Sequence, residues 1–362
     1  MAERDEAMRG FLKSAGWEGA TVAPLPGDAS TRRYFRVAHG SRRAMLMDQP
    51  QHAETPAAPA GATPEERRAL GYNAVARLAG ADVARFVAAS NFLRAQGLSA
   101  PDIYAADPAR GFALIEDLGD ALYAGELASG ADAHELYGAA IDALAKLHAE
   151  AAPATLAPGK PLHAYDETAL IAETDLMTDW FLPLALGRAA AADEVAQHRA
   201  LWRQVLAPVL AAVPVFVHRD YHAQNLIWLP ERDGLTRVGL IDFQDAVAGA
   251  KSYDLISLVE DARRDVPDGL AEAMTRRYIA AAGVDAASHR AEMAVMAAQR
   301  NAKIAGIFSR LHKRDGKPRY LDYLPRVWGY LNRDLEHPAL APLKAWYDRT
   351  IPLEARGRPR GS

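Results

Sequence analysis

The chain of 362 residues contains no cysteine. That absence excludes disulfide bonds, a thiol nucleophile and a metal site ligated by cysteine. An excess of positive charge is missing too, because 42 lysine and arginine side chains are outnumbered by 46 acidic ones and the formal net charge is −4. A nucleic-acid-binding protein that depends on basic patches is therefore not expected.

Long apolar runs are absent as well. The first residues, Met1 to Asp5, are charged and lack the apolar segment that a signal peptide needs. No stretch approaches the roughly 20 consecutive apolar residues that cross a bilayer as a helix. We therefore expect a cytoplasmic protein without a membrane partner. Its length suits one large domain or two moderate ones.

The most informative part of the chain contains three short apolar segments that predict strands, at residues 213–217, 226–229 and 237–241. This pattern places Asp220 and Asn225 in one polar loop and Asp242 just beyond the end of a hairpin strand. Because a hairpin brings such positions together, we expect these side chains to lie close to one another.

These side chains have the chemistry that phosphoryl transfer requires. Asn225 and Asp242 offer hard oxygen ligands for magnesium ions. Asp220 offers a carboxylate that can orient an accepting hydroxyl and take its proton. The loop also matches the H-R-D-x-x-x-x-N pattern of kinase catalytic loops, with His218 and Arg219 in the first two places. A polar loop with an ordinary turn would explain any one of these residues, but not their joint pattern.

The match to protein kinases is incomplete. The expected D-F-G reads Asp242-Phe243-Gln244, so its glycine is missing, and there is no A-P-E segment. The segment that corresponds to the third kinase strand, Ala44 to Asp48, contains no lysine for the α and β phosphates. These departures count against a protein kinase, and the missing lysine leaves a nucleotide-binding pseudokinase as an alternative.

A polar turn near the N-terminus offers another source of positive charge. Three antiparallel strands are predicted there, at residues 21–25, 34–37 and 43–47. The turn between the first two contains Ser30, Thr31, Arg32 and Arg33, and Arg36 follows in the strand. Backbone N–H groups, hydroxyls and guanidinium groups of such a turn can bind phosphate oxygens. An ordinary hairpin turn is the alternative.

Two further predicted strands, residues 102–106 and 112–115, complete a five-stranded region, after which the pattern becomes helical. We therefore expect a β-rich, nucleotide-binding N-lobe of residues 1–117 and a mostly helical, catalytic and substrate-binding C-lobe of residues 118–362. The hinge between them can present backbone groups to an adenine ring near Glu116 and Leu118. A plain exit from strand to loop is the alternative.

Candidates for a substrate pocket come from two places. Asp175 and Trp180 belong to a helical stretch at residues 167–186 and could line a sugar pocket, although core packing is the simpler interpretation of the aromatic ring. Asp245 is close enough in sequence to Asp242 to face a substrate.

With these motifs the chain resembles the aminoglycoside phosphotransferase and choline-kinase-like family from Gly27 to about Tyr347. Within that family it is most similar to the bacterial cell-wall sugar kinases that phosphorylate the anomeric hydroxyl of N-acetylmuramate and N-acetylglucosamine. The stretch at residues 51–80 is longer than the family usually has. The segments that suggest the narrower resemblance are residues 27–35, 46–48, 116–119, 180–182, 307–311 and 314–317.

The resemblance implies a protein-kinase-like bilobal α+β fold with ATP bound between the lobes. It implies transfer of the γ-phosphate of ATP to the C1 hydroxyl of an N-acetyl amino sugar in peptidoglycan recycling, with Asp220 as base and Asn225 and Asp242 as Mg²⁺ ligands. We expect a monomer that binds this small substrate and no nucleic acid. The same chemistry on an aminoglycoside, choline, homoserine or methylthioribose is the alternative.

Overall fold

The computed structural model describes residues 2–26, 32–50 and 56–358. Within it the chain forms two compact units that alternate along the sequence. The first unit comprises Met1–Leu147, Pro153–His163 and Ala223–Ala246, and the second comprises His148–Ala152, Ala164–His222 and Val247–Ser362. The lobes expected at residues 1–117 and 118–362 stay a prediction.

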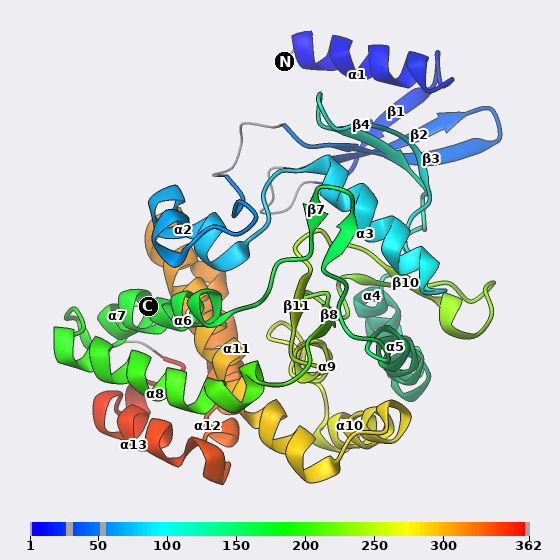
Figure 1. Ribbon diagram of the computed structural model, residues 1–362. Coiled ribbons are helices and arrows are strands. Elements are labelled where there is room, and N and C mark those ends of the chain that lie inside the picture. The colour runs from blue at the N-terminus through cyan, green and yellow to red at the C-terminus, as the bar shows by residue number, and fades with distance from the viewer. Residues whose placement is uncertain (1, 27–31, 51–55, 359–362) are drawn as a thin grey trace. The chain divides into compact units, whose positions relative to one another are not determined.

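The first unit is built on a five-stranded antiparallel sheet with the order β1-β2-β3-β5-β4 (Figure 1). Its strands are β1 (Thr21–Pro24), β2 (Arg33–His39), β3 (Arg42–Asp48), β4 (Ile103–Asp107) and β5 (Phe112–Ile115). Each overlaps a strand that the sequence predicts.

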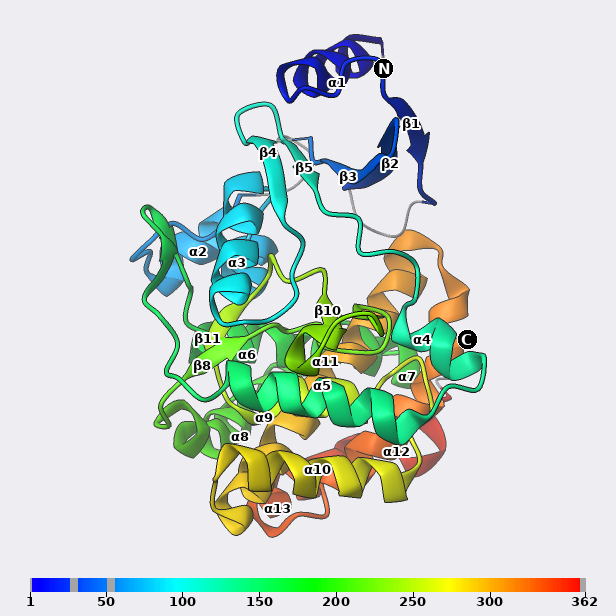
Figure 2. The ribbon, with the colours of Figure 1, turned by 90° about the vertical axis from the view of Figure 1, so that its right-hand side faces the viewer.

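Alternation along the strands gives this sheet two different faces. Val37, Leu46 and Phe112 are buried on the face covered by α1 (Ala2–Ser14), where the rings of Phe11 and Phe112 stack with centroids 5.5 Å apart. Successive side chains of a strand point to opposite faces, so their neighbours in sequence lie on the other side. In both views α3 (Val83–Ala95) lies on that other side (Figures 1 and 2).

Short helices and hairpins complete the first unit. They are α2 (Pro64–Leu70), α4 (Tyr123–Ala128), α5 (Ala133–Leu147), β6 (Thr155–Ala157), β7 (Lys160–Pro161), β9 (Leu226–Trp228) and β10 (Val238–Leu240). The antiparallel register of β9 and β10 pairs Leu226 with Leu240. This confirms the predicted hairpin and sets Asn225 and Asp242 beside each other at its end.

The second unit is mostly helical. Its elements are α6 (Glu167–Leu176), α7 (Leu182–Leu186), α8 (Ala192–Leu210), β8 (Val215–Val217), β11 (Val247–Gly249), α9 (Ser252–Val259), α10 (Asp268–Ala282), α11 (Ala286–Asp315), α12 (Leu324–Asp334) and α13 (Ala341–Thr350).

The long helix α11 is the centre of the second unit and packs against α6, α9 and α12 (Figure 2). Gly306 permits the close approach to α6, because a Cβ atom at this position would lie 2.4 Å from the backbone carbon of Leu176. The predicted fold class, α+β with a small antiparallel sheet and a mostly helical remainder, is confirmed. Among the described residues, no helix combines the length and apolarity needed to cross a membrane.

Candidate active site

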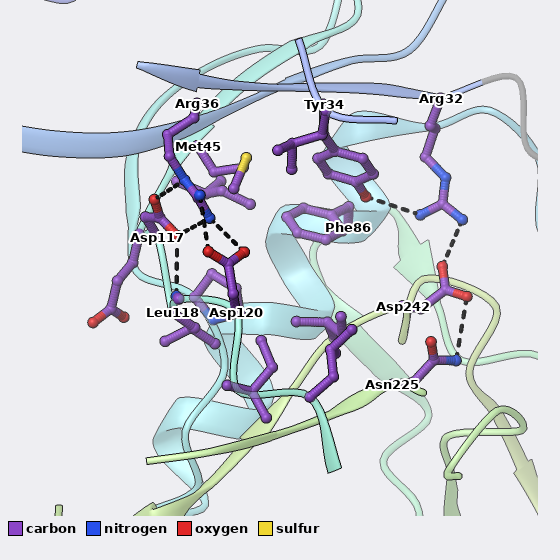
Figure 3. Close-up of a pocket in the computed structure, with 18 of the residues that line it drawn as sticks. Arg32, Tyr34, Arg36, Met45, Phe86, Asp117, Leu118, Asp120, Asn225 and Asp242 are labelled. Carbon is purple, nitrogen blue, oxygen red and sulfur yellow. Dashed lines mark hydrogen bonds and ion pairs between the residues drawn. The ribbon is translucent and has the colours of Figure 1, made fainter. Parts of the chain in front are cut away.

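The first unit contains a cavity of about 340 Å³, a size typical of small-molecule sites. Its lining comes from the sheet, from the segment after β5 and from the β9–β10 hairpin (Figure 3). Met45, Phe86 and Ile115 contribute an apolar part of the wall, and Asn225 and Asp242 a polar part. The cavity therefore offers both an apolar surface and a site for charged groups.

Asp242 lies directly after the hairpin with a left-handed backbone, φ +64°. This conformation is uncommon for a residue other than glycine and occurs often at functional sites. One carboxylate oxygen of Asp242 accepts a hydrogen bond from Gln244 Nε2 at 3.0 Å, and Asn225 Nδ2 lies 3.5 Å from the other. The structure thus brings Asn225 and Asp242 together, as the sequence predicts.

This pair suits a magnesium ion. Mg²⁺ usually takes one or two protein oxygens and completes its shell with water and substrate phosphates, rather than occupying an all-protein cage. That Asn225 and Asp242 hold such an ion stays a prediction.

Arg32 lies at the same end of the cavity (Figure 3). Its buried guanidinium donates to Asp242 Oδ1 at 2.7 Å and lies 3.4 Å from the hydroxyl of Tyr34. The side chain of Arg33 points to the opposite face of the sheet and pairs with Asp48 in β3. The carboxylate of Asp48 is fully buried and also accepts a hydrogen bond from Arg4 of α1 at 2.9 Å. Ser30 and Thr31 lie outside the described residues.

The predicted hinge residues line the cavity. Leu118 is buried beside Ile227, and Glu116 is held by its backbone N–H, which donates to the carbonyl of Asp102 at 2.8 Å. The Glu116 carboxylate accepts a hydrogen bond from Arg232 at 2.5 Å, so its charge is compensated. Whether these residues bind a nucleotide stays a prediction.

Two further acids of the same segment pair with an arginine of the sheet. Asp117 and Asp120 accept hydrogen bonds from Arg36 at 2.7 and 2.8 Å (Figure 3), and the bond to Arg36 lowers the pKa of Asp120. Arg36 thereby fastens the segment after β5 to β2 across the cavity wall. The sequence carried one signal: Tyr34 and Arg36 alternate and so share one face of β2, and Arg32, just before the strand, continues this alternation.

Asp220 belongs to the second unit, in the loop after β8. The buried carboxylate of Asp254 accepts the backbone N–H groups of His218 and Arg219 at 2.6 and 2.9 Å. Arg219 has a φ of +76°. Two hydrogen bonds to a single carboxylate, that of Asp254, hold this unusual conformation, which fixes the backbone immediately before Asp220.

The side chain of Arg219 is fixed by Glu173 of α6, which is 1% exposed. Glu173 accepts hydrogen bonds from Arg219 at 2.6 Å, Gln299 at 3.1 Å and Tyr165, and forms an ion pair with Lys303 at 2.8 Å. Burial alone would raise the pKa of Glu173, but the charges of Lys303 and Arg219 outweigh it, so the pKa lies below its usual value. The loop is therefore anchored on an ionised, buried carboxylate.

The remaining candidates divide between the units. Asp175 is in the second unit and pairs with Arg199 at 2.8 Å, which joins α6 to α8. Trp180, also in the second unit, is half-buried in a π-helical turn, Met177–Phe181. Asp245 is in the first unit, where Arg77 donates to its carboxylate at 2.7 Å. Their contact with a sugar stays a prediction.

Comparison with known proteins places these residues in context. Residues 21–297 match the phosphotransferase enzyme family. The N-acetylmuramate/N-acetylglucosamine kinase of Caulobacter vibrioides is 46% identical over 362 residues, which cover 98% of this chain and 99% of that protein.

Two solved structures with low sequence identity have similar folds. A choline/ethanolamine kinase family protein from Mesorhizobium loti has a TM-score of 0.57 at 16% identity and covers 94% of this chain and 98% of its own. An ADP-bound aminoglycoside phosphotransferase has a TM-score of 0.55 at 14% identity and covers 93% and 98%.

Proposed function

The chain belongs to the phosphotransferase enzyme family, and on this premise we propose that it transfers the γ-phosphate of ATP to the anomeric hydroxyl of N-acetylmuramate and N-acetylglucosamine. The enzyme class is that of a kinase with a hydroxyl group as acceptor. The single structural observation that carries the proposal is the convergence of Asn225 and Asp242 at the polar end of the cavity. The 46% identity to a kinase named for these two sugars supports the choice of acceptor.

We place the nucleotide in the cavity of the first unit. Its adenine packs against the apolar wall of Met45, Phe86 and Ile115, near the hinge residues Glu116 and Leu118. Its phosphates extend toward Asn225 and Asp242. Flat apolar walls suit an aromatic base, and a charged group at the other end fixes its orientation.

Magnesium held by Asn225 and Asp242 would neutralise charge on the phosphates. Arg32 supplies a second positive charge at this end of the cavity, and we propose that it does the work of the missing third-strand lysine. Its side chain is already held at the Asp242 carboxylate by a 2.7 Å ion pair. It therefore needs little reordering to meet a phosphate oxygen, which lowers the entropic cost of that contact.

We propose that Asp220 orients the sugar hydroxyl and accepts its proton. The anchors at Asp254 and Glu173 fix the backbone and side chain of the preceding residue, Arg219. A general base must be held within hydrogen-bond reach of the proton that it accepts. Asp175, Trp180 and Asp245 are the proposed contacts to the sugar, and this reaction would serve the recycling of peptidoglycan.

The two neighbouring arginines give a matched test of the phosphate site. Arg32→Ala is expected to raise the Kd for ATP about 10- to 100-fold, the range for a lost charge-assisted hydrogen bond. Arg33→Ala removes the same charge from the opposite face of the sheet and is expected to change the Kd by less than about threefold, because Arg33 pairs with Asp48. Titration calorimetry with a non-hydrolysable ATP analogue measures both, and thermal melting checks the fold. Equal effects of the two substitutions would remove Arg32 from this role.

The acceptor is tested by turnover with radiolabelled ATP and a panel of alcohols. We expect product with N-acetylmuramate and N-acetylglucosamine and little with choline, homoserine, methylthioribose or an aminoglycoside. Turnover of one of the latter four alone would overturn the amino-sugar assignment and leave the phosphotransferase class intact. ATP binding without turnover of any acceptor would favour a pseudokinase.

A further inference from the structure

The segment before α3 delivers an arginine to the region that follows Asp242. After α2 the chain forms a short π-helix, Asn73–Arg77. Arg67 of α2, which is 6% exposed, donates to the carbonyls of Ala74 at 3.0 Å and Val75 at 2.6 Å. A buried cation thus fixes the π-helix from inside.

The end of this π-helix is also strained. Leu78 has a φ of +70°, a genuine outlier for a bulky residue, and its carbonyl accepts the backbone N–H of Ala58 at 3.1 Å. Gly80 passes so close to Ala57 that a Cβ atom would lie 3.0 Å from its backbone nitrogen. Strained backbone persists only where its surroundings hold it in place. The position of Arg77 is therefore specified from both sides.

Three arginines of the first unit contact the segment Asp242–Ala246. Arg85, 5% exposed, donates to the carbonyls of Gln244 at 3.0 Å and Ala246 at 2.7 Å, and is a structural tie. Arg32 is buried at Asp242. The side chain of Arg77 is 27% exposed and donates through Nε to Asp245 Oδ2 at 2.7 Å. Of the three, Arg77 has the most exposed side chain, and Arg32 is already assigned to the phosphates.

Two acceptor atoms in the same place lack hydrogen-bond partners among the residues that the structure describes. They are Oε1 of Gln244 and Oδ1 of Asp245, both buried. Buried acceptors in proteins nearly always have a donor, so such orphaned atoms point to a water or ligand group. The hydroxyl groups and the acetamido N–H of an N-acetyl amino sugar are donors of the required kind.

The two proposed substrates differ in one charged group. N-acetylmuramate is N-acetylglucosamine with a lactyl ether, and the lactyl carboxylate is ionised at neutral pH. Planar guanidinium groups recognise carboxylates through paired, charge-assisted hydrogen bonds. An acidic neighbour that orients the arginine keeps its side chain in place when no anionic ligand is bound. Such an arginine can bind an anionic ligand but does not depend on that ligand for its position.

We propose that Arg77 is the subsite for the lactyl carboxylate of N-acetylmuramate, with Gln244 and Asp245 accepting hydrogen bonds from the sugar. This inference rests on the proposed function. Asp245 orients the guanidinium through Nε and is shared by both sugars, whereas the contact to Arg77 is made by N-acetylmuramate alone. The long segment before α3 thereby becomes a specificity element.

The test compares Arg77→Gln with wild type on both sugars. The kcat/KM for N-acetylmuramate is expected to fall about 10- to 100-fold, and that for N-acetylglucosamine to stay within about threefold. Arg68→Gln is the matched control, since Arg68 lies on α2, is 59% exposed and pairs with Glu65. This control is expected to leave both values unchanged.

A neutral substrate makes the test specific. With the methyl ester of N-acetylmuramate, the penalty of Arg77→Gln is expected to disappear, and the wild type is expected to prefer the acid over the ester. The preference of the wild type for the acid over the ester is measured without any variant, so this result still tests the proposal if Arg77→Gln fails to fold. Arg77→Lys is expected to retain part of the preference for the acid, because lysine keeps the positive charge but lacks the planar guanidinium group.

Equal losses on both sugars would overturn the proposal, because Arg77 would then act only by supporting Asp245. An unchanged kcat/KM for N-acetylmuramate, or a wild type that treats acid and ester alike, would also overturn it and place the carboxylate elsewhere. Failure of the wild type to phosphorylate either sugar would overturn the proposed function and this subsite with it. Failure of the proposed function is distinguishable from failure of the subsite, because turnover of the two sugars by the wild type is measured before any variant is made.

Discussion

Asp220→Ala is expected to bind ATP as the wild type does and to turn over at least about 100-fold more slowly, since removal of a general base costs about 10²- to 10⁴-fold. In a loose transition state the base mainly orients the hydroxyl, so kcat falls while the KM for ATP changes little. Single-turnover kinetics with saturating sugar separates these two effects.

The design of this experiment follows from how the loop is held. Asp254 and Glu173 bind the residues before Asp220, and their hydrogen bonds do not involve the side chain that is removed. The melting temperature is therefore expected to stay close to that of the wild type. Asp193→Ala, on the exposed first turn of α8, serves as control. A kcat within tenfold of the wild type would exclude Asp220 as the base.

Asp242→Asn is expected to have the larger effect and to lower kcat/KM by at least about 10³-fold. A metal ligand contributes several kcal/mol of transition-state stabilisation, and about 4 kcal/mol corresponds to that factor. The substitution keeps the shape of the side chain and removes its charge. Asn also tolerates the left-handed backbone that Asp242 adopts, so the fold is expected to be unaffected.

Steady-state kinetics at increasing Mg²⁺ concentration distinguishes a metal role from a structural one. The variant is expected to need more Mg²⁺ for half-maximal rate, because one anionic ligand is lost. Circular dichroism and the melting temperature check that the protein is folded. Retained activity with an unchanged dependence on Mg²⁺ would remove Asp242 from the metal site.

The proximity of Asn225 and Asp242 could be predicted because its geometry is local. Asn225 and Asp242 flank the two strands of one hairpin, and the register of β9 and β10 follows from their lengths and from the turn between them. The kinase-like spacing then supplied the chemistry. No contact with a distant part of the chain was needed to bring these two residues together.

The opposite orientations of Arg32 and Arg33 follow from strand alternation in the sequence. Alternation places Arg32 with Tyr34 and Arg36, while Arg33 shares its face with Phe35 and Val37. What the sequence did not reveal is the reason that Arg33 is held there. Its partner Asp48 is buried under α1, although an acidic strand end ordinarily predicts solvent exposure.

One anchor of the Asp220 loop, Glu173, could not be predicted. Glu173 lies on a helix, where charged residues normally face water, and its two ion-pair partners, Arg219 and Lys303, are far from it in sequence. The contact of Arg77 with Asp245 could not be predicted for another reason, since the segment around Arg77 has no clear helical or strand periodicity. Its position depends on the buried Arg67 and on the strain at Leu78.

Transfer of phosphate to the anomeric position of an amino sugar is tested most directly by phosphorus NMR of the product. Wild-type protein, ATP, Mg²⁺ and N-acetylglucosamine or N-acetylmuramate are predicted to give a sugar phosphate whose phosphorus couples to the single proton on C1. Coupling to the two protons on C6, or no product from either sugar, would contradict it.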